Sequence, residues 1–250
     1  MPFPLAHPAA VLPLRRYCPK FFSLPALMVG SISPDLGYCF GKVHAGEFSH
    51  QLLGSIGFCL PAGALMLALV YGVLLPLKDK LPDRWRRTFP WILPRPVGSP
   101  LVVALSLLVG AWTHLFWDSL THTSGWLVEH LPLLHAPLGF ASGHTLRVCH
   151  LLWYGGSFAG ISLLFLSYAK WARISQGNAL PADRKEDWRN AVVLAVLVLP
   201  IELIHHFVQS AFGLCFVVAS TLALLFGFVW KIAPAKPDAD RQRPPSRNAR

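Results

Sequence analysis

The chain has 250 residues, of which 54% are hydrophobic and 14% are charged, and its formal net charge is +10. This composition is too apolar for an ordinary soluble domain, and the placement of Lys and Arg in short segments between apolar stretches argues against nucleic acid as the partner. The five cysteines are scattered and form no C-x-x-C pair, which argues against a disulfide framework or a zinc ribbon.

The first 51 residues contain one short apolar stretch, residues 21–32, which Pro25 and Gly30 interrupt. A helix needs about 20 apolar residues to cross the hydrocarbon core of a bilayer. We therefore interpret residues 21–32 as a re-entrant or interfacial element, on the same side of the membrane as His50. A sixth span over residues 21–41 is the alternative.

Five later segments are long and apolar enough, or nearly so, to cross a membrane. They are residues 52–77, 98–120, 148–170, 191–209 and 212–231. We predict an all-α fold, a polytopic transmembrane helical bundle of five or six spans. Its single membrane domain covers residues 1–232, and residues 233–250 form a disordered basic tail.

The connecting segments differ strongly in charge. Residues 78–97, residues 170–190 and the tail carry most of the Lys and Arg, which predicts that these segments are cytoplasmic. The segment 121–147 has a single basic residue, Arg147, but four histidines, His122, His130, His135 and His144. We expect this segment on the non-cytoplasmic side, with His130, His135 and His144 in a solvated loop that covers the polar site described below.

Three ionisable side chains, His114, Asp118 and His122, repeat every four residues near the end of the second long span. They share one helix face, and such groups at membrane depth usually face a protein interior. His and Asp are ligands of zinc and similar cations, so we favour a metal site for His114 and Asp118. The alternative is a hydrogen-bonded pair that joins two helices.

His122 lies about 12 Å along the axis of an unbroken helix from His114, too far to share its ion. Either the helix ends near Thr121 and His122 folds back, or His122 serves a second metal or the substrate.

Other polar residues are ambiguous when each is taken alone. Asp35 suits the first turn of a helix that Ser33 caps and Pro34 begins. His7 precedes Pro8 at a comparable helix start, and His50 opens the first long span, where an interfacial histidine is equally reasonable.

Glu202 and His206 form a second pair four residues apart, inside an apolar segment. They either add ligands or orient a metal-binding histidine, or they hydrogen-bond each other between buried helices.

Four motifs, taken in order, resemble a bacterial membrane family described as domain-of-unknown-function family 4184. They are His7-Pro8-Ala-Ala-Val-Leu-Pro-Leu, Ser33-Pro34-Asp35-Leu-Gly-Tyr38, Ser49-His50-Gln-Leu-Leu-Gly54 and His114…Asp118…Thr121-His122. More distantly, their order is similar to that in membrane-bound metal-dependent hydrolases, and loosely to that in zinc-dependent phospholipase C enzymes. By position, the resemblance implies five metal ligands, namely His7, Asp35, His50, His114 and Asp118.

The chain departs from the hydrolase pattern in two places. Gly37 stands where these hydrolases typically have the second acid of a Pro-Asp-x-Asp motif, and His122 occupies a position that is more often not histidine. One metal-binding acid is therefore absent, or His122 or Glu202 replaces it.

These observations lead us to expect a metal-dependent hydrolase that acts on an ester or phosphoester of a lipid or envelope component. Zinc would lower the pKa of a bound water to about 7, and Asp118 or Asp35 would act as general base if it does not bind the metal. We expect the protein in the bacterial inner (cytoplasmic) membrane, among membrane lipids, with its site on the non-cytoplasmic side. The alternatives are a non-enzymatic transporter or ion-binding bundle that uses the same polar face, and a purely structural bundle.

Overall fold

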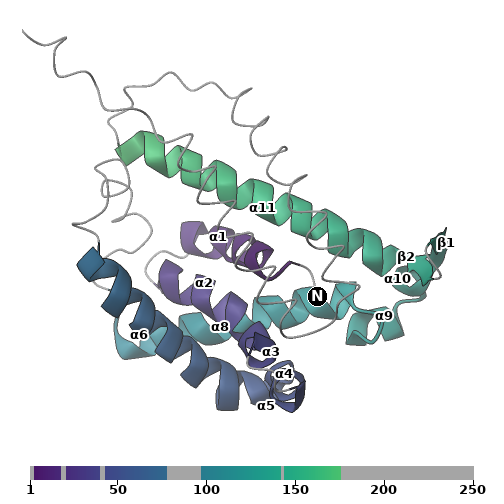
Figure 1. The fold of residues 1–250 in the computed structure, drawn as a ribbon, viewed down its shortest axis with the longest axis horizontal. Helices are drawn as coiled ribbons and strands as arrows, with labels where there is room; N and C mark the ends of the chain where they lie inside the picture. The colour runs from purple at the N-terminus through teal and green to yellow at the C-terminus, as the bar shows by residue number, and fades with distance from the viewer. Residues whose placement is uncertain (1–2, 18–20, 40–42, 78–96, 142–143, 176–250) are drawn as a thin grey trace, which may run out of the picture.

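The computed structural model describes residues 3–17, 21–39, 43–77, 97–141 and 144–175, which form a mainly helical assembly with one β-hairpin (Figure 1). The predicted spans 191–209 and 212–231, the tail, Glu202 and His206 lie outside the described residues. The helical elements are η1 (Pro4–Ala6), α1 (Pro8–Tyr17), α2 (Leu24–Ile32), η2 (Ser33–Asp35), α3 (Leu36–Cys39), α4 (Val43–Ser49), α5 (Leu52–Gly54), the π-helical turn η3 (Ser55–Cys59), α6 (Leu60–Leu77), α8 (Pro100–Thr121), α9 (Trp126–His130), α10 (Pro132–His135) and α11 (Val148–Ser175). The strands are β1 (Pro137–Ala141) and β2 (His144–Arg147).

Three helices of the described part are long and apolar enough to cross a membrane, namely Leu52–Gly72, Pro100–Thr121 and Val148–Trp171. They coincide with the segments predicted as spans over 52–77, 98–120 and 148–170, and they are candidate spans by length and composition. Leu65, Leu101 and Leu163 on these helices are each more than half exposed. Large apolar side chains exposed in this way on every span are consistent with a membrane protein, because lipid rather than water would surround them.

The predicted interfacial stretch belongs to one continuous run of helical backbone, formed by α2, η2 and α3. The run is not one of the described helices that are long enough to cross a membrane. The expected cap at Ser33 is wrong: its backbone N–H already donates to the carbonyl groups of Val29 and Gly30, and its hydroxyl donates to Gly30 O at 2.8 Å. Because the chain enters η2 already helical, no free amide is left there for a cap to satisfy.

Helices α2 and α8 approach each other closely because each carries a glycine that faces the backbone of the other helix. A Cβ atom on Gly30 would lie 2.2 Å from the carbonyl oxygen of Leu107, and one on Gly110 would lie 2.3 Å from that of Leu27. Small residues permit such contacts between membrane helices. Their close approach brings the Asp35 end of the α2 run beside the second half of α8.

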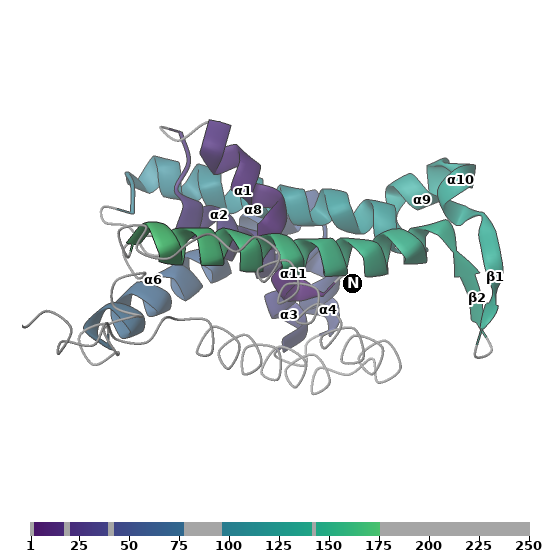
Figure 2. The ribbon, with the colours of Figure 1, turned by 90° about the horizontal axis from the view of Figure 1, so that it is seen from above.

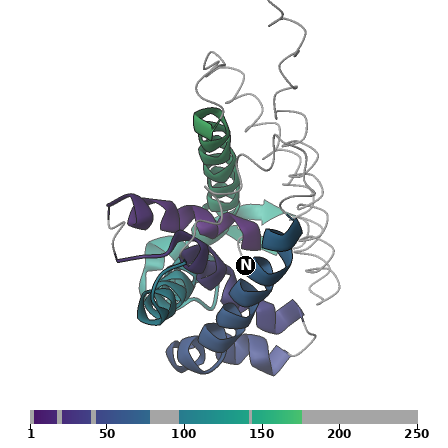
Figure 3. The same cartoon turned by 90° about the vertical axis from the view of Figure 1, so that its left-hand side faces the viewer.

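Phe3, the first residue that the structure describes, is hydrogen-bonded to α11. The Phe3 N–H donates to Ser157 Oγ at 3.0 Å, and the Phe3 side chain is buried. Helices α1 and α2 therefore lie between α11 on one side and α6 and α8 on the other (Figures 1 and 3). This packing holds the turn in front of α1, which carries His7, inside the assembly.

The segment 121–147 is not the predicted solvated loop. It folds into α9, α10 and an antiparallel hairpin in which Phe140 pairs with Thr145, beyond one end of the long helices (Figure 2). His130 stacks on Trp126, and His135 contacts Arg147 at 2.9 Å. The all-α prediction misses this hairpin, because strand pairing depends on cross-strand contacts that the helical periodicity of the flanking spans does not reveal.

Candidate metal centre

The side chains of His7, Asp35, His50, His114 and Asp118 converge on one buried point. His7 lies between η1 and α1, Asp35 ends η2, His50 lies between α4 and α5, and the other two belong to the last turns of α8. His114 is fully buried, and Asp35, His7 and Asp118 are at most 7% exposed. The structure thus brings together, from four segments, all five residues that the resemblance implied as ligands.

Four donor atoms of this cluster are evenly spaced. His114 Nε2 lies 3.2 Å from Asp118 Oδ2 and 3.5 Å from Asp35 Oδ1, and His50 Nε2 lies 3.4 Å and 3.5 Å from the same two oxygens. Hydrogen bonds between charged groups are shorter, about 2.7–2.9 Å. Ligands of a tetrahedral cation with bonds of about 2.0–2.2 Å are separated by about 3.3–3.6 Å. These four nitrogen–oxygen distances are therefore longer than direct hydrogen bonds and match the separation of two ligands on one cation.

The convergent atoms have no hydrogen-bond partners among the described residues, although all are buried. These atoms are His7 Nε2, His50 Nε2, His114 Nε2, Asp35 Oδ1, Asp35 Oδ2, Asp118 Oδ1 and Asp118 Oδ2. Buried polar atoms in folded proteins are nearly always paired, because an unpaired one costs free energy. Seven such atoms around one point form a donor set that a cation would satisfy.

Backbone carbonyl groups orient two of the imidazoles. His114 Nδ1 lies 2.8 Å from Ser31 O, and His50 Nδ1 lies 2.7 Å from Gly46 O. Since a carbonyl oxygen only accepts, each Nδ1 carries the hydrogen and donates it, which turns Nε2 toward the carboxylates. Histidines that bind metals are typically held in this way by a second hydrogen bond.

Ser49 joins the two segments that carry Asp35 and His50. Its hydroxyl oxygen lies 2.6 Å from Pro34 O and 2.7 Å from Gly46 O. Sequence reasoning assigned no role to Ser49, whose only signal was its place next to His50. The supporting carbonyl groups of Ser31 and Gly46 leave no trace in the side-chain pattern.

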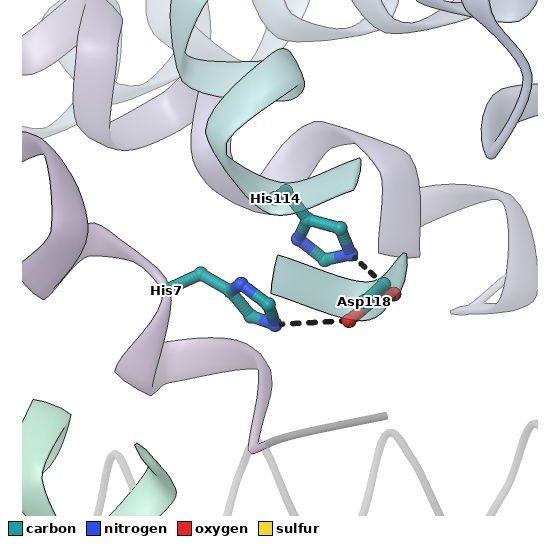
Figure 4. Close-up of side chains that lie close together, drawn as sticks. All are labelled: His7, His114 and Asp118. Carbon is teal, nitrogen blue, oxygen red and sulfur yellow. Dashed lines mark ion pairs between the residues drawn. The ribbon is translucent and has the colours of Figure 1, made fainter. Parts of the chain in front are cut away.

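His7 faces the other carboxylate oxygen of Asp118, Oδ1. Its Nε2 lies 3.8 Å from Asp118 Oδ1, and its ring stacks on that of His114 with centroids 3.8 Å apart and an angle of 20° between the planes (Figure 4). Two groups of donors each lie within 4.8 Å of one another: His7, His114 and Asp118, and Asp35, His50 and His114. Both groups could hold a metal ion.

His122 lies at the edge of the cluster. Helix α8 ends at Thr121, and His122 folds back toward Asp118, which agrees with the first alternative predicted for His122. Its Nδ1 lies 3.1 Å from Asp118 O and 3.8 Å from Asp118 Oδ1. Its side chain is 31% exposed and that of His50 is 19% exposed. These two imidazoles therefore border the side from which solvent reaches the centre.

The cluster lies at one end of two spans. His50 precedes Leu52–Gly72, and Asp118 belongs to the last turn of Pro100–Thr121. The opposite ends of these spans are joined in the sequence by residues 78–97, the basic segment. The centre thus lies at the opposite ends of these two spans from Gly72 and Pro100.

The surroundings of the cluster shift the pKa values of His50 and His7 in opposite directions. Burial alone lowers the pKa of His50, but the carboxylates of Asp118 and Asp35 outweigh it and raise this pKa to about 9. Burial and the adjacent His114 lower the pKa of His7 to about 3. Burial opposes ionisation of Asp35, yet His114 and His50 hold its pKa below the usual range. At neutral pH, the metal-free centre therefore has a protonated His50, a neutral His7 and an ionised Asp35.

The affinity of the metal-free protein for a divalent cation is expected to rise with pH. Because the cation displaces the His50 proton, that residue contributes about a tenfold gain in affinity per pH unit up to its pKa of about 9. His7 is already neutral and contributes none. Competition against a chelator at several pH values measures this slope, and His50→Gln should reduce it by one proton. An affinity independent of pH below that pKa would refute the displacement.

The comparison with protein families identifies a match over most of the chain. Residues 1–236 match the model of a family described as "Domain of unknown function (DUF4184)". No curated protein and no solved structure matches the chain.

Proposed function

We propose that this chain, which belongs to the DUF4184 family, is a membrane-bound metal-dependent hydrolase that cleaves an ester or phosphoester of a lipid or envelope component. The family description names no activity, so the proposal rests on the site. The observation that carries it is the set of seven buried donor atoms without hydrogen-bond partners around one point. A purely structural cluster would be expected to pair these atoms with one another.

Zinc is the cation that best suits the donors. Asp35, His50, His114 and Asp118 would hold it through two imidazole nitrogens and two carboxylate oxygens, whose nitrogen–oxygen distances are 3.2–3.5 Å, whereas Mg²⁺ and Ca²⁺ prefer oxygen ligands alone. The two carboxylates would balance the charge of the ion. Bound zinc supplies a Lewis acid that polarises an ester or phosphoryl oxygen and activates water at neutral pH.

The remaining chemistry belongs to residues at the open edge. His122 is the most exposed of the clustered imidazoles and lies against Asp118. Burial lowers the pKa of His122, and its Nδ1 faces the carbonyl oxygen of Asp118, so its neutral Nε2 is suited to accept a proton. Ser31 O and Gly46 O keep His114 and His50 turned inward during turnover.

The surroundings favour an amphiphilic substrate. On the same half of α8 as His114, the side chains of Trp112 and Phe116 are 45% and 61% exposed, as expected for a surface in contact with acyl chains. A substrate embedded in the bilayer would reach the centre with its polar group at the end of the spans. The charge of residues 78–97 favours the inner membrane, with the centre on the non-cytoplasmic side.

The test uses the full chain purified in detergent. Elemental analysis should find a stoichiometric divalent metal, and a panel of phospholipids and soluble phosphoesters should be hydrolysed by metal-loaded but not by chelator-treated protein. His130→Ala, which changes an exposed histidine stacked on Trp126, is the matched control and should keep both metal and turnover. Absence of metal would overturn the proposal, and metal without turnover on any substrate would favour the ion-binding bundle.

A further inference from the structure

We infer that the centre holds two cations, with the carboxylate of Asp118 between them and His7 as a ligand of the second. This inference rests on the proposed function in one respect, since both require the cluster to bind metal. It goes further by assigning the number of ions and the class of substrate.

A single cation does not account for the donors present. An ion held by Asp35 Oδ1, His50 Nε2, His114 Nε2 and Asp118 Oδ2 would use four of the seven unpaired atoms. His7 Nε2, Asp118 Oδ1 and Asp35 Oδ2 remain, all buried and without a hydrogen-bond partner in the described structure. Of these atoms, His7 Nε2 and Asp118 Oδ1 lie 3.8 Å apart, close enough to bind a second cation together.

The stacking of His7 on His114 favours a separate ion for each ring. The lone pair of Nε2 lies in the plane of its ring, and the two planes are only 20° from parallel, with centroids 3.8 Å apart. An ion shared by two such rings would lie out of the plane of at least one of them, away from the direction of its lone pair. Ions in two-metal sites are separated by about 3.5–4 Å, close to the spacing of these rings.

Asp118 presents one oxygen to each ring. Oδ2 lies 3.2 Å from His114 Nε2, and Oδ1 lies 3.8 Å from His7 Nε2 (Figure 4). A carboxylate in this position can bridge two cations, one on each oxygen. His122, whose Nδ1 is also 3.8 Å from Oδ1, stands on the side of the second ion, at the open edge.

The charge balance points to a phosphoester substrate. Two divalent cations bring four positive charges, and Asp35 and Asp118 offset two of them. The excess is complementary to an anionic phosphoester, whose attacking and leaving oxygens a pair of metals can stabilise together. A neutral carboxylic ester has no charge to match it.

The test counts ions in chelator-stripped, full-length protein titrated with Mn²⁺. Equilibrium dialysis should give two equivalents, and electron paramagnetic resonance should show the signal of a spin-coupled pair. His7→Ala and His7→Gln should each bind one equivalent with an uncoupled signal, while the control His130→Ala keeps the pair. Inorganic phosphate should tighten the second equivalent, because linkage between two bound ligands is reciprocal.

The outcomes separate this inference from the proposed function. One equivalent in the unsubstituted protein, with an uncoupled signal, would overturn the second ion and leave the hydrolase proposal standing. No bound Mn²⁺ or Zn²⁺ would overturn both. Two coupled ions that phosphate does not affect would support the pair and overturn the phosphoester assignment. Since the coupled signal of the unsubstituted protein is decisive alone, the test does not depend on the folding of the variants.

Discussion

Replacement of His114 by alanine is expected to strip the protein of metal. His114 is fully buried, and its Nε2 lies 3.2 Å from Asp118 Oδ2 and 3.5 Å from Asp35 Oδ1. Loss of a residue that merely orients a ligand typically costs about 10–100-fold in metal affinity, so loss of the ligand itself should cost more than about 100-fold. The substitution also leaves Asp35 and Asp118 without the imidazole between them, which we expect to destabilise the fold by about 3–5 kcal/mol.

The measurements are metal content after purification, affinity in competition with a chelator, and thermal unfolding in detergent. His130→Ala is the appropriate control, because that ring is exposed and stacks only on the exposed Trp126. A His114→Ala protein that retains its full complement of metal would rule out His114 as a ligand.

Substitution of Gly110 by leucine is expected to lower metal affinity and stability, although it changes none of the proposed ligands. The new Cβ would lie 2.3 Å from Leu27 O and 2.8 Å from Ser31 N, both of them backbone atoms that cannot rotate away. Overpacking usually costs about 1–3 kcal/mol, and here α2 must also move away from α8. That movement would break the contact between Ser31 O and His114 Nδ1 and withdraw Asp35, so metal affinity and stability should fall together.

Gly155→Leu provides the matched comparison on α11, since a Cβ atom at that exposed glycine meets nothing within 4 Å. It should leave the unfolding temperature and metal content unchanged. If Gly110→Leu behaved in the same way, the close packing of α2 on α8 would not be what positions the site.

The π-helical turn η3 illustrates how an irregular element supports the same region. It opens the span that follows His50, and its Ser55 hydroxyl accepts a hydrogen bond of 3.0 Å from Trp112 Nε1 on α8. Its Cys59 thiol donates to Ser49 O at 3.3 Å. Such turns often occur at functional sites in helices. Here the turn links the His50 segment to the helix that carries His114 and Asp118.

Local patterns were enough to identify part of this site. A spacing of four residues places His114 and Asp118 on one helix face, whatever the rest of the chain does. In the structure, His114 Nε2 lies 3.2 Å from Asp118 Oδ2. Membership of the family, which the order of four motifs indicated, is confirmed by the match over residues 1–236. Asp35 shows the limit of such reasoning: a helix-capping motif accounted for it fully, and only its contacts with His50 and His114 show that its carboxylate faces the centre.

The sequence by itself determined the three described spans, because the length and hydropathy of a helix are local properties that its own residues supply. It also determined the kind of donors available, since imidazoles and carboxylates among apolar residues restrict the chemistry. The tertiary structure alone decided that His7 and His50 meet the α8 pair. That meeting depends on contacts between distant backbones, such as Gly30 on Leu107 and Phe3 on Ser157, and no periodicity within one segment encodes where another segment will pack.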